Sequence, residues 1–184
     1  MKEQKYSKSF QIALSAISCA VAAAFLSLGI LSGYLLALGY LIGILALMVP
    51  LSKQFYLGGF LAYVGTCILT IILGAVARFW DLLPFIMFFG LHPLANSLQI
   101  RFKINRWLAY LIKAVWFVGT LFAGYFMIIY GFIGGGLQLR FFEIVNKYIY
   151  VLIPVVGAAL FLAYDYLIFK CQIMINSLVY RIRK

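Results

Sequence analysis

Residues 12–30 read IALSAISCAVAAAFLSLGI, an unbroken run without a charged side chain. A helix that crosses the roughly 30 Å hydrocarbon core of a bilayer needs about 20 such residues. A strand of a membrane barrel would require apolar and polar residues in alternation, and this run does not alternate. The run therefore predicts a transmembrane helix.

The rest of the chain repeats this apolar character. It has 184 residues, of which 66% are hydrophobic and 10% charged, whereas soluble domains are about half apolar and about a quarter charged. We expect an all-α integral membrane protein, with residues 1–184 forming a single transmembrane domain. Six transmembrane helices are predicted at 10–31, 34–48, 55–77, 82–100, 107–132 and 148–175. Pro50 is expected to end the second helix, and Arg140, Glu143 and Lys147 to lie in the loop before the sixth.

The basic residues are distributed unevenly between the two predicted sides of the membrane. One side has only Arg78, Arg140 and Lys147, and Lys113 falls inside the fifth span. The other side collects Lys2, Lys5, Lys8, Lys53, Arg101, Lys103, Arg106, Lys170, Arg181, Arg183 and Lys184. Cytoplasmic loops are enriched in Lys and Arg, so both termini are predicted in the cytoplasm, with the chain in an inner membrane. The net charge of +11 is explained by this topology, and no nucleic-acid partner is expected.

His92 is the only histidine and lies within an apolar stretch, with Asn96 four residues later on the same helical face. Gly90 and Pro93 favour a kink that would turn both side chains toward the protein interior. One interpretation is a histidine that is hydrogen-bonded to a neighbouring helix. The other is a ligand contact, by hydrogen bonding or by axial ligation of a porphyrin metal.

Four alanines of the first predicted helix, Ala13, Ala16, Ala20 and Ala24, are spaced three or four residues apart and share one face. Such a small-residue face lets another helix approach closely. It fits internal packing against a helix of the same chain. It fits equally well a docking surface for a second membrane subunit.

Other polar groups are few, and each has two interpretations. Asp165 is expected either to pair with Lys113 or Lys170 or to serve a proton or substrate role. The outer ends of the predicted helices carry tyrosines that suit either an interfacial belt or a pocket for a flat aromatic ligand: Tyr34, Tyr125, Tyr130, Tyr148 and Tyr150.

Motifs of catalysis and ATP hydrolysis are absent from the sequence. It has no phosphate-binding loop, no HExxH and no nucleophile elbow, so we expect a protein that is not an enzyme. Uphill transport would then draw energy from a partner subunit or an ion gradient. The cysteines Cys19, Cys67 and Cys171 lie apart in apolar segments, and no intrinsic metal or cofactor is expected.

The chain resembles the substrate-binding S components of energy-coupling-factor transporters over its whole length. The resemblance rests on size, on topology and on Ala16-xxx-Ala20 and Ala20-xxx-Ala24, which match the family's AxxxA docking motif. It implies capture of a scarce micronutrient outside the cell, either a vitamin-like molecule or a tetrapyrrole such as heme. It also implies partnership with a membrane coupling subunit and two ATPases.

The resemblance implies a binding site as well, open to the outside and built from outer helix ends. It nominates His92, Asn96, Tyr125, Tyr130, Tyr148 and Tyr150 as substrate-binding residues, with Gly134, Gly135 and Gly136 as a lid. Two other function classes stay open. One is an autonomous carrier, small channel or accessory subunit, and the other is a membrane enzyme acting on a lipid or prenyl substrate.

Overall fold

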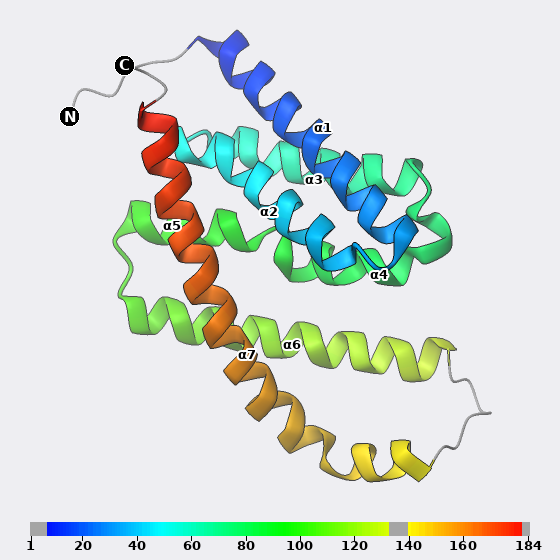
Figure 1. Ribbon diagram of the computed structural model, residues 1–184. Coiled ribbons are helices and arrows are strands. Elements are labelled where there is room, and N and C mark those ends of the chain that lie inside the picture. The colour runs from blue at the N-terminus through cyan, green and yellow to red at the C-terminus, as the bar shows by residue number, and fades with distance from the viewer. Residues whose placement is uncertain (1–6, 133–139, 182–184) are drawn as a thin grey trace. The chain divides into compact units, whose positions relative to one another are not determined.

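The computed structural model describes residues 7–132 and 140–181, and every regular element in these ranges is helical (Figure 1). The all-α class is therefore confirmed. The five long helices are α1 (Lys8–Ser32), α2 (Leu36–Ser52), α3 (Tyr56–Ile72), α6 (Arg106–Phe132) and α7 (Arg140–Arg181). Between α3 and α6 the chain forms a segmented helix, composed of the 3-10 turn η1 (Ala75–Arg78), α4 (Phe79–Pro84), the π-helical η2 (Phe85–Phe89) and α5 (His92–Phe102).

Several of these elements are long and apolar enough to cross a membrane. Among the described residues there are four such stretches, namely Lys8–Ser32, Val76–Phe102, Arg106–Met127 and Tyr148–Val179. The apolar helices α2 and α3 have 17 residues each, which corresponds to about 26 Å of helix. The fold thus indicates a multi-pass helical membrane protein.

The end of α2 differs from the prediction. The helix continues through Pro50 to Ser52, because a proline near the last turn removes only one helical hydrogen bond. The chain then turns, and the Pro50 carbonyl oxygen accepts from the backbone N–H groups of Lys53 at 3.2 Å and Phe55 at 3.1 Å.

The start of α7 also differs from the prediction. Arg140, Glu143 and Lys147, which were expected in a loop, are helical residues of α7. Hydropathy marks where a helix enters the apolar core, whereas the helical backbone itself can begin earlier with polar residues. The predicted lid, Gly134–Gly136, lies outside the described residues.

The chain divides into two compact units. Unit 1 comprises residues 1–103 and 168–184, and unit 2 comprises residues 104–167, so α7 contributes to both. The core of unit 1 is formed by apolar residues of α1, α2, α4 and η2. Its fully buried members include Ala22, Leu26, Ile30, Leu47, Met48, Leu82, Phe85 and Phe88.

Helices α1 and α2 of unit 1 form a hairpin whose backbones lie very close together. A Cβ atom added to Gly39 would lie 2.7 Å from the Phe25 carbonyl oxygen and 3.1 Å from the Gly29 Cα. The connecting turn uses Gly33 at φ 70°, a conformation that costs glycine little. Glycine at these positions is therefore what permits the close contact between the two helices.

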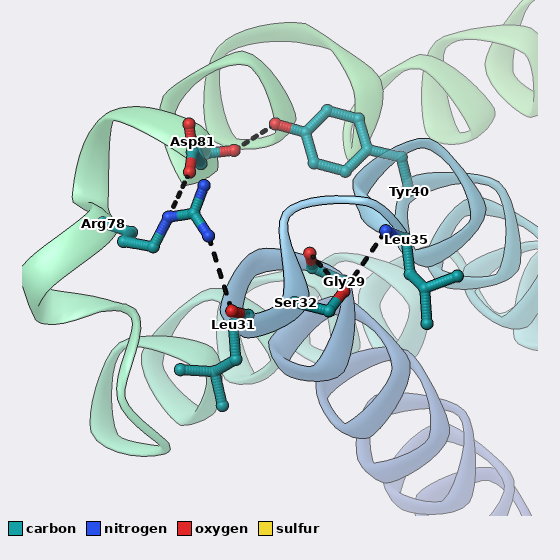
Figure 2. A network of polar contacts seen from close by, with 7 residues as sticks. All are labelled: Gly29, Leu31, Ser32, Leu35, Tyr40, Arg78 and Asp81. Carbon is teal, nitrogen blue, oxygen red and sulfur yellow. Dashed lines mark hydrogen bonds and ion pairs between the residues drawn. The ribbon is translucent and has the colours of Figure 1, made fainter.

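The end of this hairpin is tied to η1 and α4 by Arg78 (Figure 2). The Arg78 guanidinium donates to the Leu31 carbonyl oxygen at 3.5 Å, and its Nε lies 2.8 Å from Oδ2 of Asp81. The Tyr40 hydroxyl of α2 donates to the backbone carbonyl oxygen of Asp81. A cation beside the last carbonyls of a helix is favourable, because those oxygens have no helical partner. Arg78 thus joins the C-terminal end of α1 to the segmented helix.

Unit 2 consists of α6 and residues 140–167 of α7, which pack through aromatic rings. The Phe161 ring is fully buried, and its centroid lies 5.2 Å from that of Tyr110 and 5.6 Å from that of Phe117. Gly157 of α7 is in close contact with α6, because a Cβ there would lie 2.8 Å from the Leu121 Cδ1.

Candidate functional site

The segmented helix of unit 1 is interrupted in the middle of the apolar stretch Val76–Phe102. The Gly90 N–H donates to the Phe85 carbonyl at 2.8 Å, a π-helical bond, and the Leu91 N–H donates to the Phe88 carbonyl at 3.1 Å. Neither of these two N–H groups donates to the carbonyl oxygen of Ile86, which Gly90 would reach in a regular α-helix. π-helical segments inside α-helices occur frequently at functional sites.

A tyrosine from α3 compensates for this interruption. The Tyr63 hydroxyl donates to the Ile86 carbonyl oxygen at 2.7 Å. A carbonyl without a hydrogen bond inside a bilayer costs several kcal/mol, so this contact stabilises the break. Gly90 allows it, because a Cβ there would lie 2.6 Å from the Tyr63 ring and 2.8 Å from the Phe85 ring.

His92 and Asn96 lie in α5 immediately after the break that Gly90 and Pro93 were expected to cause. Both residues have no exposed surface. The imidazole packs against Phe88, with ring centroids 5.1 Å apart. Pro93 occupies the first turn of α5, where a missing N–H is best tolerated. Two polar side chains are thus held inside unit 1 at the start of a helix.

Two further buried polar side chains were not found from the sequence. Ser97 of α5 and Gln172 of α7 are both buried, and the Gln172 Nε2 donates to the Ser97 Oγ at 2.5 Å. The buried Gln172 Oε1 accepts no hydrogen bond from the described residues. The signal in the sequence that could have revealed Gln172 is its amide side chain, which interrupts the apolar run around Cys171. Polar residues buried in membrane helices are costly and are often functional.

The predicted tyrosines belong to unit 2 and are mostly near its surface. Tyr125 is half-buried, whereas Tyr148 and Tyr150 are exposed. The Tyr150 ring stacks on Phe122 with a centroid distance of 6.1 Å, which joins α7 to α6. Tyr130 is a residue of α6 whose side chain lies outside the described part. Exposed tyrosines of this kind suit an interfacial belt.

The predicted docking alanines lie on the surface of unit 1. Ala13, Ala16, Ala20 and Ala24 are all exposed. The opposite side of α1 is the buried one, formed by Ser15, Ser18, Ala22, Ala23 and Leu26. The other helices of unit 1 therefore leave these four alanines exposed.

A buried ion pair joins the two helices of unit 2. The Lys113 Nζ lies 2.5 Å from Oδ1 of Asp165, and the two side chains are 7% and 13% exposed. This contact confirms the expected pairing of Asp165 with Lys113. Pairing of opposite charges is how ionisable side chains are tolerated inside a membrane.

The described residues contain no group of three or more His, Cys, Asp or Glu side chains arranged to hold a metal ion. Cys19, Cys67 and Cys171 are free thiols. The chain matches no known protein family, no characterised protein and no solved structure.

Proposed function

We propose that this chain is the substrate-binding S component of an energy-coupling-factor importer in the cytoplasmic membrane of a bacterium. In this proposal six helices span the bilayer, including α2 and α3, since about 17 residues are enough to cross it. Both termini lie in the cytoplasm. The charge bias supports this orientation, because Lys8, Lys53 and Arg101 lie at helix ends that meet in unit 1.

The exposed alanine face of α1 is the observation that carries the proposal. Ala16, Ala20 and Ala24 point away from the core of unit 1. Small residues on a membrane helix allow another backbone to approach closely, and such contacts drive helix association in lipid. A coupling subunit that places a helix on this face would cover it. Energy for import would come from two ATPases attached to that subunit, since the chain has no phosphate-binding loop.

The interrupted helix supports a role in binding a small solute. Transporters commonly build substrate sites where a membrane helix is discontinuous, because such a break presents polar groups at membrane depth. Here the break presents His92 and Asn96. Tyr125, Tyr130, Tyr148 and Tyr150, with Gly134–Gly136 as a lid, remain the proposed outer part of the site.

The ligand in this proposal is a vitamin-like micronutrient or a tetrapyrrole such as heme. The imidazole of His92 is fully buried against Phe88. A porphyrin metal would reach it only after α5 moves relative to its neighbours. A smaller ligand that hydrogen-bonds to His92 and Asn96 requires less displacement.

The docking step can be tested with bulky substitutions on the alanine face. Ala16→Leu combined with Ala20→Leu should abolish copurification of the coupling subunit and the ATPases, and reduce uptake, while the ligand stays bound. A matched control is Ala159→Leu combined with Ala163→Leu, because these alanines of α7 are also exposed and four residues apart. The control should leave copurification and uptake unchanged.

Two outcomes would contradict the proposal. Uptake that survives Ala16→Leu/Ala20→Leu would show that this face does not dock a coupling subunit. Uptake into liposomes that contain the purified chain and no ATPase would instead favour an autonomous carrier.

A further inference from the structure

Five helix ends of unit 1 meet at one end of the unit. The start of α1 meets the start of α3, where the Phe10 and Phe55 ring centroids are 6.4 Å apart. The end of α2 meets the end of α7, where the Lys53 Nζ donates to the Val179 carbonyl oxygen at 3.3 Å. The end of α5 meets the start of α3, where Arg101 lies over the Tyr56 ring.

This end of unit 1 is positively charged. It carries Lys8, Lys53, Arg101 and Lys103, which we call the basic end. Of the carboxylates whose side chains the structure describes, Asp81 lies beside Arg78 at the other end of α1 and Asp165 lies in unit 2. Neither of these two carboxylates lies at the basic end.

Arg101 is held in a position that suits phosphate recognition. Its guanidinium carbon lies 4.7 Å from the Tyr56 ring centroid and 5.7 Å from that of Phe102, while the residue remains exposed. Stacking on an aromatic face fixes the guanidinium plane and leaves the N–H groups at its edge available. Those N–H groups match two oxygens of a phosphate.

The residues around this guanidinium are of the kinds that gather at the level of lipid headgroups. Aromatic side chains gather at membrane–water interfaces, and the basic end includes Phe10, Phe55, Tyr56 and Phe102. Two of the elements that end here, α1 and the stretch Val76–Phe102, are long and apolar enough to cross the hydrocarbon core of a bilayer. Basic residues beside such segments attract anionic lipids.

We propose that the basic end of unit 1 binds the headgroup phosphate of anionic phospholipids, with Arg101 as the principal phosphate ligand and Lys8, Lys53 and Lys103 supplying the surrounding positive potential. This site is independent of the solute captured by the protein. It requires only that unit 1 lies in a bilayer.

The test is native mass spectrometry of the purified full chain in an equimolar mixture of phosphatidylglycerol and phosphatidylcholine with identical acyl chains. The intact protein should retain phosphatidylglycerol several-fold more than phosphatidylcholine. Arg101→Gln should reduce this preference about fivefold, the effect expected from one base near an anionic surface. Arg101→Lys should give an intermediate loss, because it keeps the charge but not the planar donor pair.

Arg78→Gln is the matched control, since it removes the same charge at the other end of α1, about 37 Å away for a helix of 25 residues. It should leave the lipid preference unchanged. Circular dichroism and gel filtration should show that each variant is folded. If Arg101→Gln does not fold, Lys103→Gln tests the same lipid preference, which it should also reduce. Equal retention of the two lipids, an equal effect of Arg78→Gln, or displacement of the lipid by inorganic phosphate would overturn the proposal.

Discussion

The hydroxyl of Tyr63 donates a hydrogen bond to the carbonyl oxygen of Ile86, across 2.7 Å from α3 to the π-helical segment. The break in the segmented helix is thus supported by a side chain from another helix, in addition to the local effects of Gly90 and Pro93. A discontinuity supported in this way is a fixed part of the structure.

Tyr63→Phe should therefore destabilise unit 1. The variant leaves the Ile86 carbonyl without this donor in an apolar environment, and we expect a loss of about 1–2 kcal/mol in the free energy of unfolding. Titration with a denaturing detergent, followed by circular dichroism, measures it. Tyr34→Phe is the control, because Tyr34 is 100% exposed, and it should have no effect. Equal stability of the two variants would show that the hydroxyl contact is unimportant.

Gly39→Ala should separate α1 from α2. The added methyl group would lie 2.7 Å from the Phe25 carbonyl oxygen, so the backbones must move apart, at a cost of about 1–3 kcal/mol. Gly119→Ala in α6 is the matched control, because a Cβ there meets no atom within 4 Å, and it should be neutral or slightly stabilising. Thermal unfolding in detergent distinguishes the two. A Gly39→Ala protein that unfolds like the wild type would contradict the close packing of the hairpin.

Asp165→Asn should be strongly destabilising, because it removes the carboxylate that faces the buried Lys113 ammonium. Loss of one member of a buried pair typically costs about 3–5 kcal/mol. The double variant Lys113→Met/Asp165→Leu should recover most of that loss, whereas Lys170→Met at an exposed position should change stability by less than about 0.5 kcal/mol.

The same double variant separates a structural role of the ion pair from a functional one. If it is stable and transports normally, the pair only holds α6 to α7. If it is stable and transport is lost, the pair takes part in substrate or proton movement.

His92→Ala should weaken ligand binding. If the ligand is heme, the protein purified from heme-supplied cells should show a Soret band that shifts in this variant, as expected when an axial imidazole is lost. If the ligand is a vitamin-like molecule, native mass spectrometry should show its mass in the wild type and less of it in His92→Ala. Tyr34→Phe should match the wild type in both measurements. Unchanged binding in His92→Ala and in Asn96→Ala would place the ligand elsewhere.

The sequence predicts the all-α class of this protein because lipid imposes a simple requirement. An apolar run such as residues 12–30 must form its backbone hydrogen bonds internally, so composition alone indicates a helix. The ends of helices depend on other forces. Pro50 lies inside α2 and Arg140 begins α7, because backbone hydrogen bonding at a helix end does not follow hydropathy.

The candidate site could be predicted only in part for a similar reason. His92 and Pro93 are conspicuous within an apolar stretch, and the structure places them directly after the break. Tyr63 and Gln172 are connected to that region only through tertiary contacts, with Ile86 and Ser97 respectively. Their sequence separations of 23 and 75 residues carry no local signal.

The contact of Arg78 with Asp81 and with the end of α1 has a consequence for how the chain enters a membrane. Moving an isolated guanidinium through the hydrocarbon is costly, but here the charge is offset by a carboxylate three residues away and by the carbonyls of a helix end. The local net charge of this end of unit 1 is therefore low, which would reduce the cost of moving it through a bilayer. The other end of unit 1 carries Lys8, Lys53, Arg101 and Lys103. In the proposed orientation, with both termini in the cytoplasm, we therefore expect the Arg78 end to cross the bilayer more readily than the basic end.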